Sequence, residues 1–178
     1  LIALLREKIE RASEGVRFRG VVYAGLMIGE QGPQVLEFNA RFGDPETQPL
    51  MVRLASDLVP ALQAAASGGL DGVEIRWDPR PSVCVVMASG GYPGSYQKGK
   101  PIDGLDAAGQ MEDVVVFHAG TREQDGRILT DGGRVLGVTA LGTDIREAVD
   151  RAYRAVDVIR FDGAQVRTDI AHRALARA

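Results

Sequence analysis

The sequence has few of the residues that form disulfides or bind zinc. Its 178 residues include one cysteine and two histidines. A single cysteine excludes a disulfide within this chain and fits a reducing compartment, so we predict a cytoplasmic location. A zinc site is also disfavoured, because zinc prefers sulfur and imidazole ligands. Cys84 lies in the apolar run Ser-Val-Cys-Val-Val-Met, where we expect a small buried side chain rather than a nucleophile.

The sequence also lacks a strong charge of one sign and any long apolar run. It has 21 basic and 24 acidic residues, a net charge of −3, whereas a surface that binds nucleic acid is basic. No stretch approaches the roughly 20 apolar residues of a membrane-spanning helix. A hydrophobic content of 45% is sufficient for a folded core. We therefore expect one domain or two small ones, with neither nucleic acid nor a membrane as partner.

The sequence does contain the pattern of a β-hairpin near its start. Residues 18–28 are rich in apolar and β-prone residues, residues 30–33 (Glu-Gln-Gly-Pro) favour a turn, and residues 34–39 return as a second strand. A turn signal between two such runs is typical of a hairpin.

Three polar residues follow each other at every second position of the second strand: Glu37, Asn39 and Arg41. Side chains alternate across a strand, so these three are predicted to share one face. Carboxylate and amide oxygens suit Mg²⁺, and a guanidinium matches phosphate oxygens. The alternate positions, which we expect to be core, are Leu36, Phe38 and Ala40. The alternative is an edge strand with a solvated charged face.

Helix signals flank and follow the hairpin. Apolar residues recur at helical spacing over residues 1–13. Asp44-Pro-Glu reads as a helix start, with Asp44 as N-cap. Pro60 interrupts a later leucine repeat, which predicts two helices, and Asp57 is expected to cap the second, which Gly68-Gly69 would end.

The pattern changes to strands after a polar, proline-containing stretch at residues 70–81, which we interpret as a linker. Strands are predicted at residues 83–88, 114–119, 127–130, 134–141 and 165–167, with a glycine-rich turn at 90–94 and a hairpin turn at 131–133. Thr143 is expected to cap a helix with the apolar face Ile145, Val149, Ala152, Val156 and Ile159. A short helix is predicted after Asp169.

The stretch Glu37-Phe-Asn-Ala-Arg-Phe-Gly-Asp-Pro-Glu46 resembles the metal-binding end of ATP-grasp ligases. More closely, it resembles the phosphoribosylamine–glycine ligase (glycinamide ribonucleotide synthetase) family. Residues 90–94, 130–142 and 167–170 resemble the same family, so the resemblance covers essentially the whole chain. It implies an α+β fold: the second half of an ATP-grasp domain at 1–69, the linker, and a small, mostly antiparallel β domain with a packed helix at 82–178. It also implies a carboxy-terminal fragment whose partner is a missing amino-terminal half.

The resemblance further implies a reaction of de novo purine biosynthesis: ATP-dependent ligation of glycine to 5-phosphoribosylamine through glycyl phosphate, with Mg²⁺ or Mn²⁺. Glu37 and Asn39 would bind the metal beside ATP. Arg41 would contact the transferring phosphoryl group, or else pair with Asp44 or Glu46. Gly43 would offer its N–H to a developing oxyanion, or only permit a turn. Asp44 would orient the glycine amine, or only cap a helix.

Other functions stay open at this point. The chain could belong to another ATP-grasp carboxylate–amine ligase or carboxylase, or serve as a non-catalytic binding or scaffolding module. Tyr92, Tyr96 and Lys98 flank the glycine-rich turn and could face an active site, although a plain turn is the interpretation we favour. His118 is expected to be a hydrogen-bonded structural residue.

Overall fold

The structure is a computed structural model that describes residues 18–176. The helix predicted over residues 1–13 lies outside the described residues. Within them the chain divides into two compact units: residues 18–43 with 55–76, and residues 44–54 with 77–176. The predicted linker and its boundaries stay a prediction. No helix in the described range is long and apolar enough to cross a bilayer.

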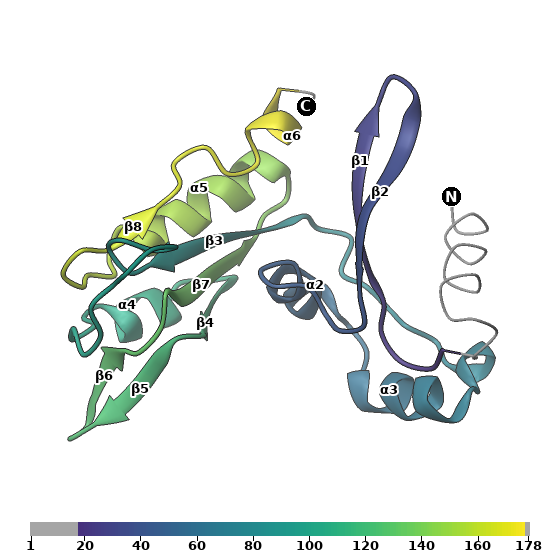
Figure 1. Cartoon of the computed structure of the whole chain (residues 1–178), viewed down its shortest axis with the longest axis horizontal. Helices are drawn as coiled ribbons and strands as arrows, with labels where there is room; N and C mark the ends of the chain where they lie inside the picture. The colour runs from purple at the N-terminus through teal and green to yellow at the C-terminus, as the bar shows by residue number, and fades with distance from the viewer. Residues whose placement is uncertain (1–17, 177–178) are drawn as a thin grey trace. The chain divides into compact units, whose positions relative to one another are not determined.

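The first unit begins with the predicted hairpin (Figure 1). Strands β1 (Tyr23–Gly29) and β2 (Gly32–Asn39) pair in antiparallel fashion around a tight turn. The register shifts between Gly25 and Leu26, which leaves Leu36 as the extra residue of a β-bulge. The predicted hairpin is confirmed, with its bulge just before the polar positions.

The side of the hairpin that we expected to be core is exposed. Leu36 is 64% exposed and Phe38 is 37% exposed, and Ala40 is exposed as well. In the described part of the chain β1 and β2 form a sheet of two strands only. Alternation shows which side chains share a face, but a two-stranded sheet buries a face only where another layer covers it.

Two helices follow in the sequence, as predicted, the first of them in the second unit and the other in the first. They are α2 (Thr47–Arg53) and α3 (Leu58–Ser67). Asp57 caps α3 by accepting a hydrogen bond from the backbone two residues on, at 2.9 Å. Gly68 ends α3 in the left-handed conformation, with φ of 88°. Pro60 lies in the first turn of α3, where its missing N–H leaves no bond unmade.

The predicted start of α2 is wrong. Its N-cap is Glu46, which makes no side-chain cap bond, and Asp44-Pro-Glu forms a turn before the helix. The Asp44 carboxylate is instead engaged by Gln48 and Arg134. After α3, residues 70–81 contain the 3₁₀ helix η1 (Leu70–Gly72).

The second unit is built on a four-stranded antiparallel sheet in the order β4-β7-β3-β8. Its strands are β3 (Ser82–Ala88), β4 (Val114–His118), β7 (Arg134–Leu141) and β8 (Gln165–Val166). These match the predicted strands, and the central strand β7 is buried along nearly its whole length. The short helix predicted after Asp169 is α6 (His172–Leu175).

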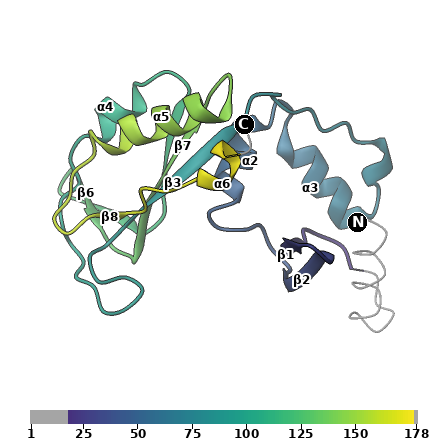
Figure 2. The same ribbon diagram turned by 90° about the horizontal axis from the view of Figure 1, so that it is seen from above.

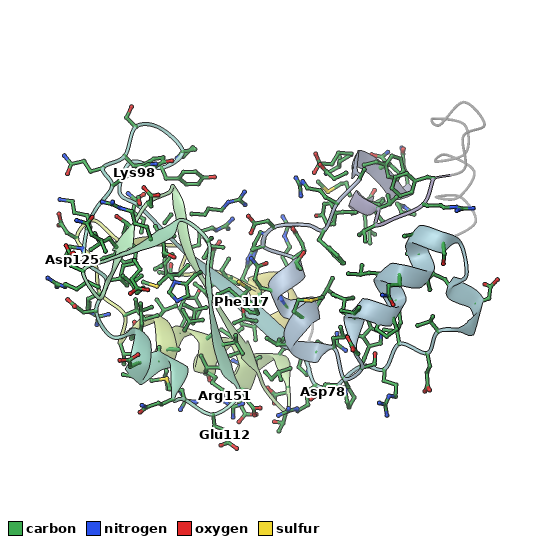
Figure 3. The ribbon with its side chains drawn as sticks, turned by 90° about the horizontal axis from the view of Figure 1, so that it is seen from below. Asp78, Lys98, Glu112, Phe117, Asp125 and Arg151 are labelled. Atoms are coloured by element: carbon green, nitrogen blue, oxygen red, sulfur yellow. The ribbon has the colours of Figure 1, made fainter. Side chains whose placement is uncertain are left out.

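The hairpin predicted around residues 131–133 is wrong. Strand β6 (Arg127–Thr130) pairs with β5 (Thr121–Gln124), a strand that was not predicted. The turn between them is Asp125-Gly126, with φ of 52° and 72°, which suits a tight hairpin; Figure 3 labels Asp125 at this turn. Residues 131–133 instead lead into the larger sheet and pass against Gly120, where an added side-chain carbon would meet their backbone at 2.5 Å.

Helix α5 (Ile145–Val156) covers one face of the sheet, and Figure 2 shows it running along β3 and β7. Its N-cap is Asp144, one residue after the predicted Thr143, because the Asp144 carboxylate accepts from the Glu147 backbone at 2.8 Å. Together with the short helix α4 (Leu105–Gly109) it encloses the core. The predicted apolar face is confirmed along α5, where Val149, Ala152 and Val156 are buried and Ile145 is half-buried. Ile159 is buried as well, but it lies beyond the end of the helix.

Candidate functional site

Strand β2 places Glu37 and Asn39 on the same side of the hairpin. Glu37 lies opposite Gly25 and Asn39 lies opposite Tyr23, with no irregularity between the two pairs. Positions two apart on an unbroken strand share a face. Glu37 is exposed and Asn39 is half-buried, so neither oxygen-bearing group is sealed in a dry interior.

Gly25 gives Glu37 the room that it occupies. A Cβ added to Gly25 would lie 3.0 Å from the Glu37 Cγ, which is tighter than ordinary van der Waals contact. A glycine here therefore lets the Glu37 side chain lie across the neighbouring strand.

Arg41 and Gly43 come after the strand ends. Because β2 finishes at Asn39, the alternation that relates Asn39 to Glu37 does not extend to Arg41, which lies in a bend. Arg41 is exposed and donates to the Phe42 carbonyl at 2.8 Å. Gly43 is buried.

Asp44 is held by two residues of its own unit. The Arg134 guanidinium pairs with the Asp44 carboxylate at 3.4 Å and donates to the Asp44 carbonyl at 2.8 Å. The Gln48 amide donates to the other carboxylate oxygen at 3.2 Å. Sequence reasoning missed Arg134, although this residue lies within the stretch 130–142 that carried part of the family resemblance.

The donor set on β2 fits Mg²⁺ or Mn²⁺ and fits zinc poorly. Among the described residues no group of three or more His, Cys, Asp or Glu side chains could hold a metal. Mg²⁺ is commonly held by only one or two carboxylates, with water and substrate phosphates completing its shell. Glu37 and Asn39 supply a hard oxygen pair of that kind.

Cys84 and His118, which we expected to be structural residues, have surroundings that fit that role. Cys84 is buried, and burial raises the pKa of its thiol, with a contact to Thr139 acting in the opposite direction. A raised pKa disfavours the thiolate that a cysteine nucleophile requires. His118 lies with its Nδ1 3.0 Å from the Thr121 hydroxyl, as a hydrogen-bonded structural histidine would.

Solved structures of low sequence identity share the fold of this chain. One is N5-carboxyaminoimidazole ribonucleotide synthetase from Thermotoga maritima, with a TM-score of 0.58 and 16% identity, covering 89% of this chain and 42% of that one. Another is the biotin carboxylase domain of the Hydrogenobacter thermophilus 2-oxoglutarate carboxylase, with a TM-score of 0.59 and 17% identity, covering 89% and 35%. These likenesses concern the α+β fold alone. The ATP-grasp class comes from the family match, since residues 4–47 match "Phosphoribosylglycinamide synthetase, ATP-grasp (A) domain".

Residues 82–173 match "Phosphoribosylglycinamide synthetase, C domain". The chain belongs to the phosphoribosylglycinamide synthetase family. It is similar to the phosphoribosylamine–glycine ligase of Rhodopirellula baltica, with 55% identity over 162 residues, covering 90% of this chain and 37% of that protein. The ligase of Allochromatium vinosum is 57% identical, with coverage of 93% and 39%.

The solved phosphoribosylamine–glycine ligase of Thermotoga maritima has a TM-score of 0.73 and 35% identity, covering 92% of this chain and 42% of that one. The chain thus spans less than half the length of each of these relatives.

Proposed function

We propose that this chain is the carboxy-terminal part of an ATP-dependent ligase that joins glycine to 5-phosphoribosylamine in de novo purine biosynthesis. The observation that carries the proposal is the Glu37–Asn39 pair on one face of β2, within the stretch that matches an ATP-grasp domain. Relatives of 55–57% identity that bear the ligase's name support it. The cytoplasmic location stays a prediction.

The proposed reaction has two steps. The glycine carboxylate attacks the γ-phosphate of ATP, which gives glycyl phosphate and ADP, and the amine of 5-phosphoribosylamine then displaces phosphate. In the first step two anions must approach each other, so the site has to supply positive charge and hydrogen-bond donors. Mg²⁺ or Mn²⁺ bound at the site would neutralise part of the charge on the ATP phosphates.

Each candidate residue has a part in this proposal. Glu37 and Asn39 hold the metal through oxygen atoms. Arg41, always charged, binds phosphoryl oxygens through paired N–H groups. Gly43 brings its backbone close to the acyl oxygen, and Asp44 accepts a hydrogen bond from the glycine amine.

The proposed reaction also requires the part of the relatives' sequences that this chain does not match, which would act as its partner. The chain covers 37% and 39% of two of these ligases, so most of the pockets for ATP and 5-phosphoribosylamine would come from the rest of the enzyme. By itself the chain is expected to ligate nothing.

The test is Glu37→Ala in a whole ligase, assembled from this chain and the amino-terminal part that its relatives have. Loss of the metal-holding carboxylate should lower ADP formation that depends on glycine and 5-phosphoribosylamine by roughly 100-fold or more. Glu30→Ala is the control, because Glu30 is an exposed acid in the turn of the same hairpin. Near-normal turnover of Glu37→Ala would exclude the assigned role.

Two other functions make different predictions in the same assay. An ATP-grasp carboxylase or a different carboxylate–amine ligase would turn over ATP with bicarbonate or formate and not with glycine. A binding or scaffolding module would show no substrate-dependent ADP formation with any acceptor, even when the amino-terminal part is supplied.

A further inference from the structure

We propose that Arg134 is a positioning residue: it fixes Asp44 so that the Asp44 carboxylate can bind the amine of glycine. The inference rests on the proposed ligase function, and it gives the carboxy-terminal unit a direct part in recognising the amino acid.

Arg134 holds Asp44 at two points. One nitrogen donates to the main-chain carbonyl of Asp44 at 2.8 Å, and the other lies 3.4 Å from its carboxylate oxygen Oδ2. Gln48 donates to Oδ1 at 3.2 Å. A contact to both main chain and side chain fixes the direction in which a carboxylate points.

The carboxylate of Asp44 still has room for a ligand. Its side chain is 45% exposed and that of Arg134 is 40% exposed. A carboxylate offers about four acceptor sites, and Gln48 and Arg134 each use one oxygen. An incoming ammonium group can therefore donate to the free sites of an anion that is already oriented.

The backbone before Arg134 is held in place from the neighbouring glycine-rich loop. The Ser89 hydroxyl, which is buried, donates to the Gly132 carbonyl at 2.8 Å, and the Ser89 N–H donates to the Gly133 carbonyl at 2.8 Å. The Tyr92 ring lies on Gly133 so closely that an added Cβ there would meet it at 2.2 Å.

Further contacts extend this support along the loop. The rings of Tyr92 and Tyr96 meet edge to face, with centroids 6.3 Å apart. Lys98, labelled in Figure 3, pairs with Asp131 at 3.4 Å. The two glycine-rich stretches of the sequence, residues 90–94 and 130–142, are therefore in contact with each other. Arg134 follows these contacts as the first residue of β7.

Because the Arg134–Asp44 pair is exposed, an effect of Arg134 on glycine binding can be distinguished from an effect on protein stability. Ion pairs that are this accessible to water add little to the free energy of unfolding. Removing Arg134 should therefore alter glycine use far more than the melting temperature, because small displacements of a substrate-binding group can cost up to 100-fold in rate.

The kinetic test compares Arg134→Gln, Arg134→Lys, Asp44→Asn and the double variant in the whole ligase. Arg134→Gln should raise KM for glycine about tenfold or more and leave KM for ATP within about twofold, with Arg134→Lys in between. The double variant should be no worse than Asp44→Asn, because Arg134 acts through Asp44. An unchanged KM for glycine, or additive losses, would overturn the inference.

A second measurement does not depend on activity. In this chain, Arg134→Gln should speed hydrogen exchange of the peptide covering residues 40–54 about tenfold, while the control Arg127→Gln, at an exposed arginine of β6, should not. Unchanged exchange would overturn the inference even in an active ligase. Absence of glycine-dependent ADP formation in the unaltered ligase would instead overturn the proposed function, and the exchange result would still decide whether Arg134 holds Asp44.

Discussion

Glu37 lies directly opposite Gly25 in the β1–β2 ladder, and an added Cβ at Gly25 would come within 3.0 Å of the Glu37 Cγ. A branched side chain at position 25 should therefore push the carboxylate away from its position beside Asn39. We expect Gly25→Val to lower kcat/KM of the whole ligase roughly tenfold or more. Gly29→Val is the control, since nothing lies within 4 Å of a Cβ there, and equal losses in the two variants would contradict this account.

Asp113 joins two arginines from distant parts of the second unit. Its Oδ2 lies 2.8 Å from Arg80 and 3.0 Å from Arg151, which is labelled in Figure 3. Asp113 has φ of 58°, a conformation that asparagine also tolerates, so Asp113→Asn removes the charge without new backbone strain. We expect the melting temperature to fall by roughly 3–6 °C.

The control for Asp113→Asn is Glu112→Gln at the neighbouring position, because Glu112, labelled in Figure 3, is exposed. Scanning calorimetry of both variants is the measurement. Equal melting temperatures for the two variants would mean that Asp113 does not stabilise the unit through its charge.

Glu147 should make the free energy of unfolding of the second unit fall as the pH is lowered. Its carboxylate accepts from the backbone N–H and the hydroxyl of Thr143, each at 2.7 Å, and these bonds lower the pKa of Glu147. With a lowered pKa the folded state binds fewer protons than the unfolded state in mild acid. The stabilisation is therefore present at neutral pH and is lost as pH falls through the lowered pKa of Glu147.

Denaturant unfolding at several pH values tests this expectation. The unaltered chain should be more stable than Glu147→Gln at pH 7, and the difference should shrink as the carboxylate protonates. A difference that stays constant with pH would rule out the charge of Glu147 as its source.

Local sequence patterns predicted most strands and helices because those patterns report local preferences directly. The caps at Asp57 and Gly68 are examples. The hairpin error arose because two Asp-Gly pairs, at residues 125–126 and 131–132, offer the same turn signal. The choice between them is decided by the close passage of Gly120 and Gly132, which a local pattern does not contain. For the same reason the exposure of Leu36 could not be predicted, since burial depends on a covering layer.

In the candidate site, too, local contacts could be predicted from the sequence and a long-range contact could not. That Glu37 and Asn39 lie side by side follows from strand alternation alone, and the structure has them on an unbroken part of the register. The pairing of Asp44 with Arg134 joins residues 90 positions apart. Nothing near Asp44 in the sequence marks that partner, and the helix-cap signal pointed elsewhere.

Residues 44–54 follow the polar strand directly in the sequence, yet they group with the carboxy-terminal unit. There the Ser82 hydroxyl donates to the Pro49 carbonyl at 2.9 Å, and Gln48 lies against Gly137. The backbone consequently passes from one unit to the other three times, after residues 43, 54 and 76. No single cleavage can separate the two units intact. Gene fusion or domain shuffling must therefore transplant them together, or leave the sheet without α2, which contacts both β3 and β7.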